Sequence, residues 1–308
     1  MKTIDIKPKL PQEVIDQQRS QLDRLLKSEK IQRFMKTHSV DAAYIQKHLG
    51  RFMKWEQELS LCDGCQGLFA CRQKQNGYIL DLTIEDGILS NQISKCHYLI
   101  DQEKQRAHLS RFLINDMPEI LIPLMLDQFE LDNETYDYLM LFDKIKNWID
   151  QPVFKGLYLY GSAGCGKTYL LSALANECAK KGRSVAFIHV PSFVSRAKLY
   201  FDAPEEMEKL VTQAKTADVA FFDDIGAESV TAWSRDELLF PIINHRLEAK
   251  KSTWFSSNET PDTLKQHYAL DQKGKLATTK AIRMIERILA LADPERLVED
   301  NRRNHVSA

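Results

Sequence analysis

The sequence predicts two domains: a mainly helical N-terminal domain over residues 1–105 and an α/β domain over residues 133–308. In the second half, apolar strand-like runs alternate with amphipathic stretches, which is typical of a parallel sheet flanked by helices. In the first half, helical periodicity stops at Leu61, and a turn-rich segment with four cysteines follows. A chain of 308 residues is long enough for both domains to have a core.

Composition restricts the class of protein. Apolar residues make up 44% and charged residues 28% of the chain, which is ordinary for a globular protein. The formal net charge is −1, so any contact with DNA has to come from a local basic patch. No apolar run reaches the roughly 18–20 residues of a membrane-spanning helix, and the N-terminal stretch lacks the apolar centre of a signal peptide. We therefore expect a cytoplasmic protein that does not bind membranes.

The N-terminal elements follow from periodicity. Residues 11–60 are expected to be helical, because apolar side chains recur there at helical spacing, and Asp41 is placed to cap a second helical segment. Residues 80–84 alternate between apolar and polar, as in a half-buried strand. Residues 106–132 are expected to be a linker packed on the second domain, since prolines interrupt a helix there while its apolar residues need a surface.

The second domain is expected to begin with a helix and to continue as alternating strands and helices. The expected strands are 157–160, 185–190, 218–222 and 253–257. The expected helices are 134–149, 167–181, 192–215 and 234–250.

A phosphate-binding loop follows the first of these strands. The pattern G-x-x-x-x-G-K-[ST] is matched in full by Gly161, Ser162, Ala163, Gly164, Cys165, Gly166, Lys167 and Thr168. Glycines let backbone N–H groups turn inward around phosphates at the positive end of the next helix. Lys167 would reach the β- and γ-phosphates, and the Thr168 hydroxyl would bind Mg²⁺. The pattern predicts ATP or ADP and Mg²⁺ as cofactors.

Polar side chains follow two later strands. Asp223 is placed to hold Mg²⁺, and Asp224 to orient or deprotonate the attacking water. Glu228 is expected to be a surface or capping residue. Asn258 would face the γ-phosphate or the attacking water, although Ser-Asn is also a good turn.

Arginines near the C-terminus are candidates for neutralising charge at the γ-phosphate, from the same chain or a neighbour. Arg283 and Arg287 lie four residues apart on one helical face, and Arg302 and Arg303 follow. Surface salt bridges are the alternative.

The clustered cysteines predict a closed structural zinc site. Cys62 and Cys65 have zinc-knuckle spacing, and Cys71 and Cys96 would complete four thiolates. His97 is an alternative fourth ligand, and small buried thiols without metal are the other reading. Cys178 is expected in a core.

The phosphate loop, "FFDDIGAE", the strand end "SSN" and the helix "MIERI" together resemble AAA+ ATPases of the bacterial replicative-helicase-loader type. The cysteine-bearing module extends the resemblance over nearly the whole chain, most strongly over 150–308. It implies that the C-terminal half binds ATP and single-stranded DNA. It also implies that the N-terminal half binds the hexameric replicative helicase, which the protein helps to place on DNA with other primosome proteins during replication initiation and restart.

The resemblance also implies roles for individual residues. Asp223 and Asp224 fill the Walker B positions, and Asn258 is sensor 1. Arg287, with Arg283 as the alternative, is the arginine finger for a neighbouring subunit, and Arg302 or Arg303 is sensor 2. Most family members have Asp-Glu at Walker B, so the Asp-Asp pair implies slow hydrolysis.

Residues 192–202 are the expected contact for single-stranded DNA. Arg196 and Lys198 would meet phosphates, and Tyr200 or Phe201 would stack on a base; a half-buried helix with a solvated face is the alternative. Two other functions stay open. One is a transposition helper ATPase, against which the cysteine-bearing domain argues, and the other is a nucleotide-gated protein adaptor that does not bind DNA.

Overall fold

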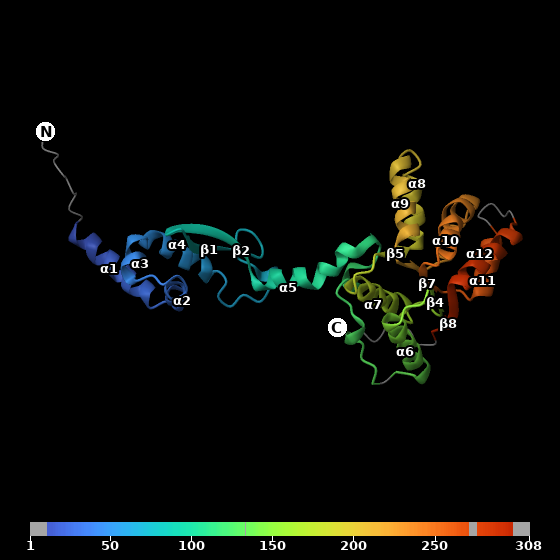
Figure 1. Ribbon diagram of the computed structural model, residues 1–308, viewed down its shortest axis with the longest axis horizontal. Coiled ribbons are helices and arrows are strands. Elements are labelled where there is room, and N and C mark those ends of the chain that lie inside the picture. The colour runs from blue at the N-terminus through green and yellow to red at the C-terminus, as the bar shows by residue number, and fades with distance from the viewer. Residues whose placement is uncertain (1–10, 133, 271–275, 298–308) are drawn as a thin grey trace. The chain divides into compact units, whose positions relative to one another are not determined.

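The computed structural model describes residues 11–132, 134–270 and 276–297 (Figure 1). The chain separates into two compact units, which meet in the sequence between Lys104 and Gln105. In the described part of the chain, no helix is both long and apolar enough to cross a membrane.

The first unit consists of short helices and a β-hairpin. Its helices are α1 (Gln12–Leu26), α2 (Glu29–His38), α3 (Ala42–Lys47), α4 (Leu49–Ser60) and the beginning of α5 (His97–Arg106). The Asp41 side chain caps α3 by accepting from the Tyr44 N–H. The strand expected at 80–84 is the centre of β1 (Tyr78–Glu85), which pairs antiparallel with an unexpected strand, β2 (Ile88–Lys95).

The core of the first unit is small. It joins one face of the helices to one face of the hairpin, and its buried members are Leu25, Ile31, Phe34, Ile45, Phe52, Trp55, Leu82 and Leu89. Three of the aromatic rings meet edge to face around Phe34 and Phe52.

The second unit contains a six-stranded parallel sheet with the order β3-β5-β6-β7-β4-β8. Its four central strands are those predicted: β4 (Lys155–Tyr160), β5 (Val185–His189), β6 (Val219–Asp223) and β7 (Ser252–Ser257). The two edge strands were not expected. They are β3 (Phe112–Asn115), which lies within the expected linker, and β8 (Ala292–Arg296).

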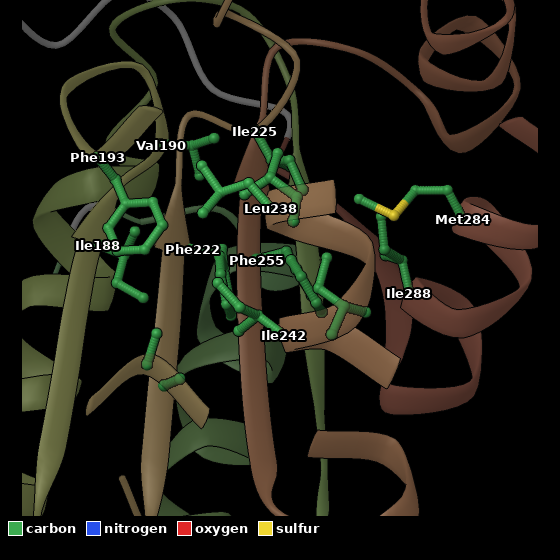
Figure 2. Packing of buried hydrophobic residues seen from close by; sticks show 14 of the residues in the cluster. Ile188, Val190, Phe193, Phe222, Ile225, Leu238, Ile242, Phe255, Met284 and Ile288 are labelled. Atoms are coloured by element: carbon green, nitrogen blue, oxygen red, sulfur yellow. The ribbon is translucent and has the colours of Figure 1, made fainter. Parts of the chain in front are cut away.

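The sheet is buried on both faces, and residues along each strand alternate between two cores. On one face, Leu157, Phe187 and Phe221 pack with α6 (Tyr136–Asp150), α7 (Lys167–Lys180) and residues 117–126. On the other, Ile188, Phe222 and Phe255 pack with side chains from α8 (Val190–Leu199), α10 (Phe240–Glu248) and α12 (Thr278–Leu291), as Figure 2 shows.

The helices of this second face differ in detail from those expected. The bounds are α8 (Val190–Leu199), α9 (Pro204–Thr216), η5 (Trp233–Leu239), α10 (Phe240–Glu248), α11 (Pro261–Ala269) and α12 (Thr278–Leu291). The single helix expected at 192–215 is two, because Pro204 starts a new helix after a turn. The helix expected at 234–250 begins with the π-helical turn η5.

Candidate nucleotide site

The phosphate loop lies between the end of β4 and the first turn of α7, inside the parallel sheet. Gly164 and Gly166 have φ angles of 86° and 103°, which only glycine adopts without strain. At Gly161, a Cβ atom would lie 2.3 Å from the Leu297 carbonyl oxygen, so close packing also requires glycine there. The loop thus turns its backbone toward the N-terminus of a buried helix, the usual geometry for an anion site.

Lys167 joins the phosphate loop to a neighbouring strand. Its ammonium donates to the Gly161 and Ser162 carbonyl oxygens, both at 2.9 Å, and to Asn258 Oδ1 at 2.8 Å. The side chain is buried, and among the described residues its hydrogen-bond acceptors are all neutral. A buried ammonium without a carboxylate partner is suited to receive an anion.

Thr168 and the acidic strand end meet at the same place. Thr168 Oγ1 donates to both oxygens of Asp223, at 3.0 and 3.1 Å. Asp223 is 3% exposed, and this burial raises the pKa of its carboxyl, while hydrogen bonds from Ser256 and Thr168 oppose the shift. A hydroxyl beside a buried carboxylate is a donor set that suits Mg²⁺, so these residues fit the implied cation.

The second acid is held in an unusual backbone conformation. Asp224 has a φ of 58°, in the left-handed region that aspartate tolerates better than most residues. Its Oδ1 accepts from Asn258 Nδ2 at 3.2 Å. Lys167, Asn258 and Asp224 therefore form one hydrogen-bonded series from the phosphate loop to the acid pair, although 57 residues separate the first from the last.

Three further side chains that the sequence singled out near the loop are all buried. Glu228 is not a surface residue: it is 4% exposed and accepts from the Gly226 N–H at 2.8 Å and the Tyr268 hydroxyl at 2.6 Å. Burial raises the pKa of the Glu228 carboxyl. Cys165 is fully buried. Cys178 is a residue of α7 that points into the core, where burial raises its thiol pKa to about 12.

The candidate arginines face α10 in this chain. Arg287 donates to Asn244 at 2.9 Å, and the exposed Arg283 lies 5.1 Å from the centre of the Phe240 ring. Arg302 and Arg303 lie outside the described residues.

The expected DNA segment has one arginine that is already paired. Arg196 forms a two-bond ion pair with the largely buried Asp116, at 2.8 and 3.0 Å. Lys198 is exposed, and Phe201 is 58% exposed although its ring packs against Trp233.

The cysteines of the first unit are not arranged as a metal site. Across the described residues, no group of three or more His, Cys, Asp or Glu side chains is placed to hold a metal ion. Cys71 Sγ accepts from the Gly77 N–H and Cys62 Sγ from the Gln73 amide, while the His97 ring lies against Tyr98. The expected zinc centre is thus not shown.

Ser256 is a site residue that the sequence analysis missed. It is fully buried on β7, and it contacts both acids through one hydroxyl. Its only signal in the sequence is its place two residues before Asn258 in the run "SSN".

A doubly covered parallel sheet, a phosphate loop after a strand inside the sheet and polar side chains on the adjoining strand ends define a P-loop ATPase fold of the AAA+ type. The family described as the bacterial DnaA ATPase domain matches residues 139–275. The replicative helicase loader DnaI of Bacillus subtilis is 32% identical over 290 residues, which is 92% of each chain. The chain therefore belongs to the DnaI family of replicative helicase loaders.

Solved structures agree with this family. A crystal structure of DnaI is 31% identical and has a TM-score of 0.53, covering 63% of this chain and 98% of its own. A putative primosome component from Streptococcus pyogenes serotype M3 is 30% identical, with a TM-score of 0.52 and coverage of 65% and 99%.

Proposed function

We propose that this chain is an ATP-dependent loader that binds the replicative helicase and helps to place it on single-stranded DNA. The observation that carries the proposal is the similarity to the loader DnaI over 92% of the chain, which includes the cysteine-bearing first unit as well as the ATPase unit. A transposition helper ATPase, or a nucleotide-gated protein adaptor that does not bind DNA, would need to resemble DnaI only over the ATPase unit.

The nucleotide site supports ATP binding and hydrolysis. In this proposal the loop amides and Lys167 bind the β- and γ-phosphates, while Thr168 and Asp223 hold Mg²⁺. Bound Mg²⁺ would neutralise phosphate charge. Asp224 and Asn258 orient the attacking water, since their side chains are already hydrogen-bonded to each other beside the loop.

The acid pair and the arginines of α12 would set how fast ATP is hydrolysed. The short Asp224 side chain in a left-handed conformation favours slow turnover, which suits a switch better than a motor. Arg287, or alternatively Arg283, completes the site of a neighbouring subunit on self-association. This requires Arg287 to break its hydrogen bond to the neutral side chain of Asn244.

We also propose that the first unit binds one zinc ion through Cys62, Cys65, Cys71 and Cys96, with His97 as the alternative fourth ligand. The supporting observations are that the four thiols are free and half-buried, and that backbone and amide N–H groups already point at two of the sulfurs. Elemental analysis of the full chain should give about one zinc per chain, and Cys62→Ser should lower it. Metal-free protein from zinc-supplemented cells would contradict the proposal.

For single-stranded DNA, we propose contacts from Lys198 in the last turn of α8 and from Tyr200 and Phe201, which directly follow this helix. Arg196 is less available because its charge is satisfied by Asp116. The prediction of contact with other primosome proteins rests on the family alone. The prediction of a cytoplasmic location rests on the family and on the sequence, in which no apolar run has membrane-spanning length.

The deciding experiment is capture of a purified hexameric replicative helicase by the full chain, with and without ATP and single-stranded DNA. We expect capture by the wild type and by Lys167→Ala, with only the wild type responding to ATP. Capture without any effect of DNA would favour the adaptor. No capture under any condition would contradict the loader proposal.

A further inference from the structure

Ser256 lies at the contact between the two strands that carry the site. It is on β7, next to the end of β6, and its side chain is fully buried. Its hydroxyl donates to Asp223 Oδ1 at 2.5 Å and accepts from the Asp224 N–H at 3.0 Å. One hydroxyl therefore contacts both residues of the acid pair.

The bond to Asp223 restricts that carboxylate. A hydroxyl donor at this distance to a charged acceptor is among the stronger hydrogen bonds in proteins. Together with the Thr168 hydroxyl it sets the plane of the carboxylate. The lone pairs left over then point in defined directions for a cation.

The bond from Asp224 restricts the backbone. The left-handed conformation of Asp224 is unfavourable for most residues and has to be stabilised by its surroundings. The Ser256 hydroxyl receives the Asp224 N–H, and the Ser256 carbonyl receives the Ile225 N–H at 2.9 Å. These two bonds carry the chain through the turn that brings the Asp224 side chain to Asn258.

From this geometry we infer that Ser256 is a positioning residue, which orients Asp223 for the cation and Asp224 for water through a single hydroxyl. Serine is suited to this because its hydroxyl donates one hydrogen bond and accepts others in a very small volume. The inference rests on the proposed nucleotide function, and it adds a residue outside the phosphate loop and the acid pair.

Ser257 provides a matched control. It is the next residue of β7 and is 1% exposed. Its hydroxyl donates to the Ile225 carbonyl at 2.6 Å and accepts from the Glu259 N–H at 3.1 Å, so it also makes two buried hydrogen bonds, but neither involves the acid pair. A loss of structure alone should affect Ser257→Ala as much as Ser256→Ala.

The test measures ADP affinity by titration of the full chain, in excess Mg²⁺ and in EDTA. The affinity in Mg²⁺ divided by the affinity in EDTA measures how much the cation strengthens ADP binding. For Ser256→Ala we expect this ratio to fall about tenfold, the size of one lost charge-assisted hydrogen bond, with affinity in EDTA unchanged. Ser257→Ala should keep the wild-type ratio.

A second readout is the ATPase reaction. Ser256→Ala should lower kcat more than it changes KM, since Asp224 acts on the reaction rather than on binding. If Ser256→Ala does not fold, Ser256→Cys decides: it nearly preserves volume, but its thiol is a weak hydrogen-bonding group, so a reduced ratio supports the inference. An unchanged ratio overturns it.

Failure of the inference can be told apart from failure of the proposed function. Wild-type protein that binds ADP in a Mg²⁺-dependent manner, with equal ratios for Ser256→Ala and Ser257→Ala, overturns the inference alone. Wild-type protein that binds no nucleotide overturns both.

Discussion

The two units hold their polar groups in different ways. In the ATPase unit, the site residues lie in the phosphate loop and at the ends of strands that are buried on both faces, and hydrogen bonds join the loop to the strand ends and the strand ends to each other. In the first unit, the four cysteines lie in turns and at the end of a hairpin beside a small core. Their sulfurs do not converge.

The difference shows what a large core contributes to a binding site. A sheet with both faces covered sets the positions of its strand ends before any ligand arrives, so Lys167, Asn258 and Asp224 already touch in series. A small unit has less buried area to set such positions, and a metal ion can supply that free energy instead. Substitutions in either unit therefore should affect that unit's own stability or binding and leave the other unit's unchanged.

Phe52→Ala removes a fully buried ring from the centre of the small core. Such truncations cost about 3–5 kcal/mol, which is comparable to the whole stability of a small domain. We expect the first unit to unfold, as followed by limited proteolysis, while ADP affinity stays within about twofold of the wild type. Joint loss of ADP binding would show that the units are not energetically separate.

Lys167→Ala removes the ammonium that connects the loop to β7. A charged group that makes two phosphate hydrogen bonds accounts for roughly 100-fold or more in affinity. ADP titration should show this loss, with helicase capture retained. Lys144→Ala, which affects only an exposed ion pair with Glu295, is the control and should bind normally.

Asp224→Asn keeps the size of the side chain and its tolerance for the left-handed conformation. Because the amide cannot act as a base, we expect kcat to fall about 100-fold with ADP affinity unchanged. Steady-state ATPase kinetics measure this. An unaltered kcat would show that the Asp224 carboxylate does not take part in ATP hydrolysis.

Glu228→Gln tests the smallest effect, the pH dependence of stability. Since burial raises the pKa of Glu228 in the folded state, the folded protein binds more protons than the unfolded one between the ordinary glutamate pKa and the raised value. Wild-type stability therefore decreases, relative to the variant, as pH rises through this window. Loss of the hydrogen bond from the Gly226 N–H lowers the stability of the variant by an amount that does not depend on pH. Chemical unfolding from pH 4 to 8 should show a flatter profile for Glu228→Gln, and parallel profiles would contradict the assignment.

Part of the fold could be predicted from the sequence because the signal is local. The four central strands are continuous apolar runs, as strands buried on both faces must be. The two edge strands carry no such signal. β8, "ADPER", is mostly polar and pairs with its neighbour through the backbone. β3 has only four residues and lies in a stretch that contains prolines.

The sequence by itself determined the phosphate-loop pattern, since its eight residues are consecutive, and it indicated the family, since the loop, the acid pair and the cysteine module occur in one order along the chain. Only the tertiary structure decided the contacts of Ser256 and Glu228. The side chain of Ser256 contacts residues 32 and 33 positions away along the chain, and Glu228 contacts Tyr268, 40 positions away. The parallel order β6-β7 and the packing of α11 bring these partners within hydrogen-bond distance. A hydroxyl or a carboxylate takes its role from what it contacts, and contacts between distant residues exist only after the sheet has formed.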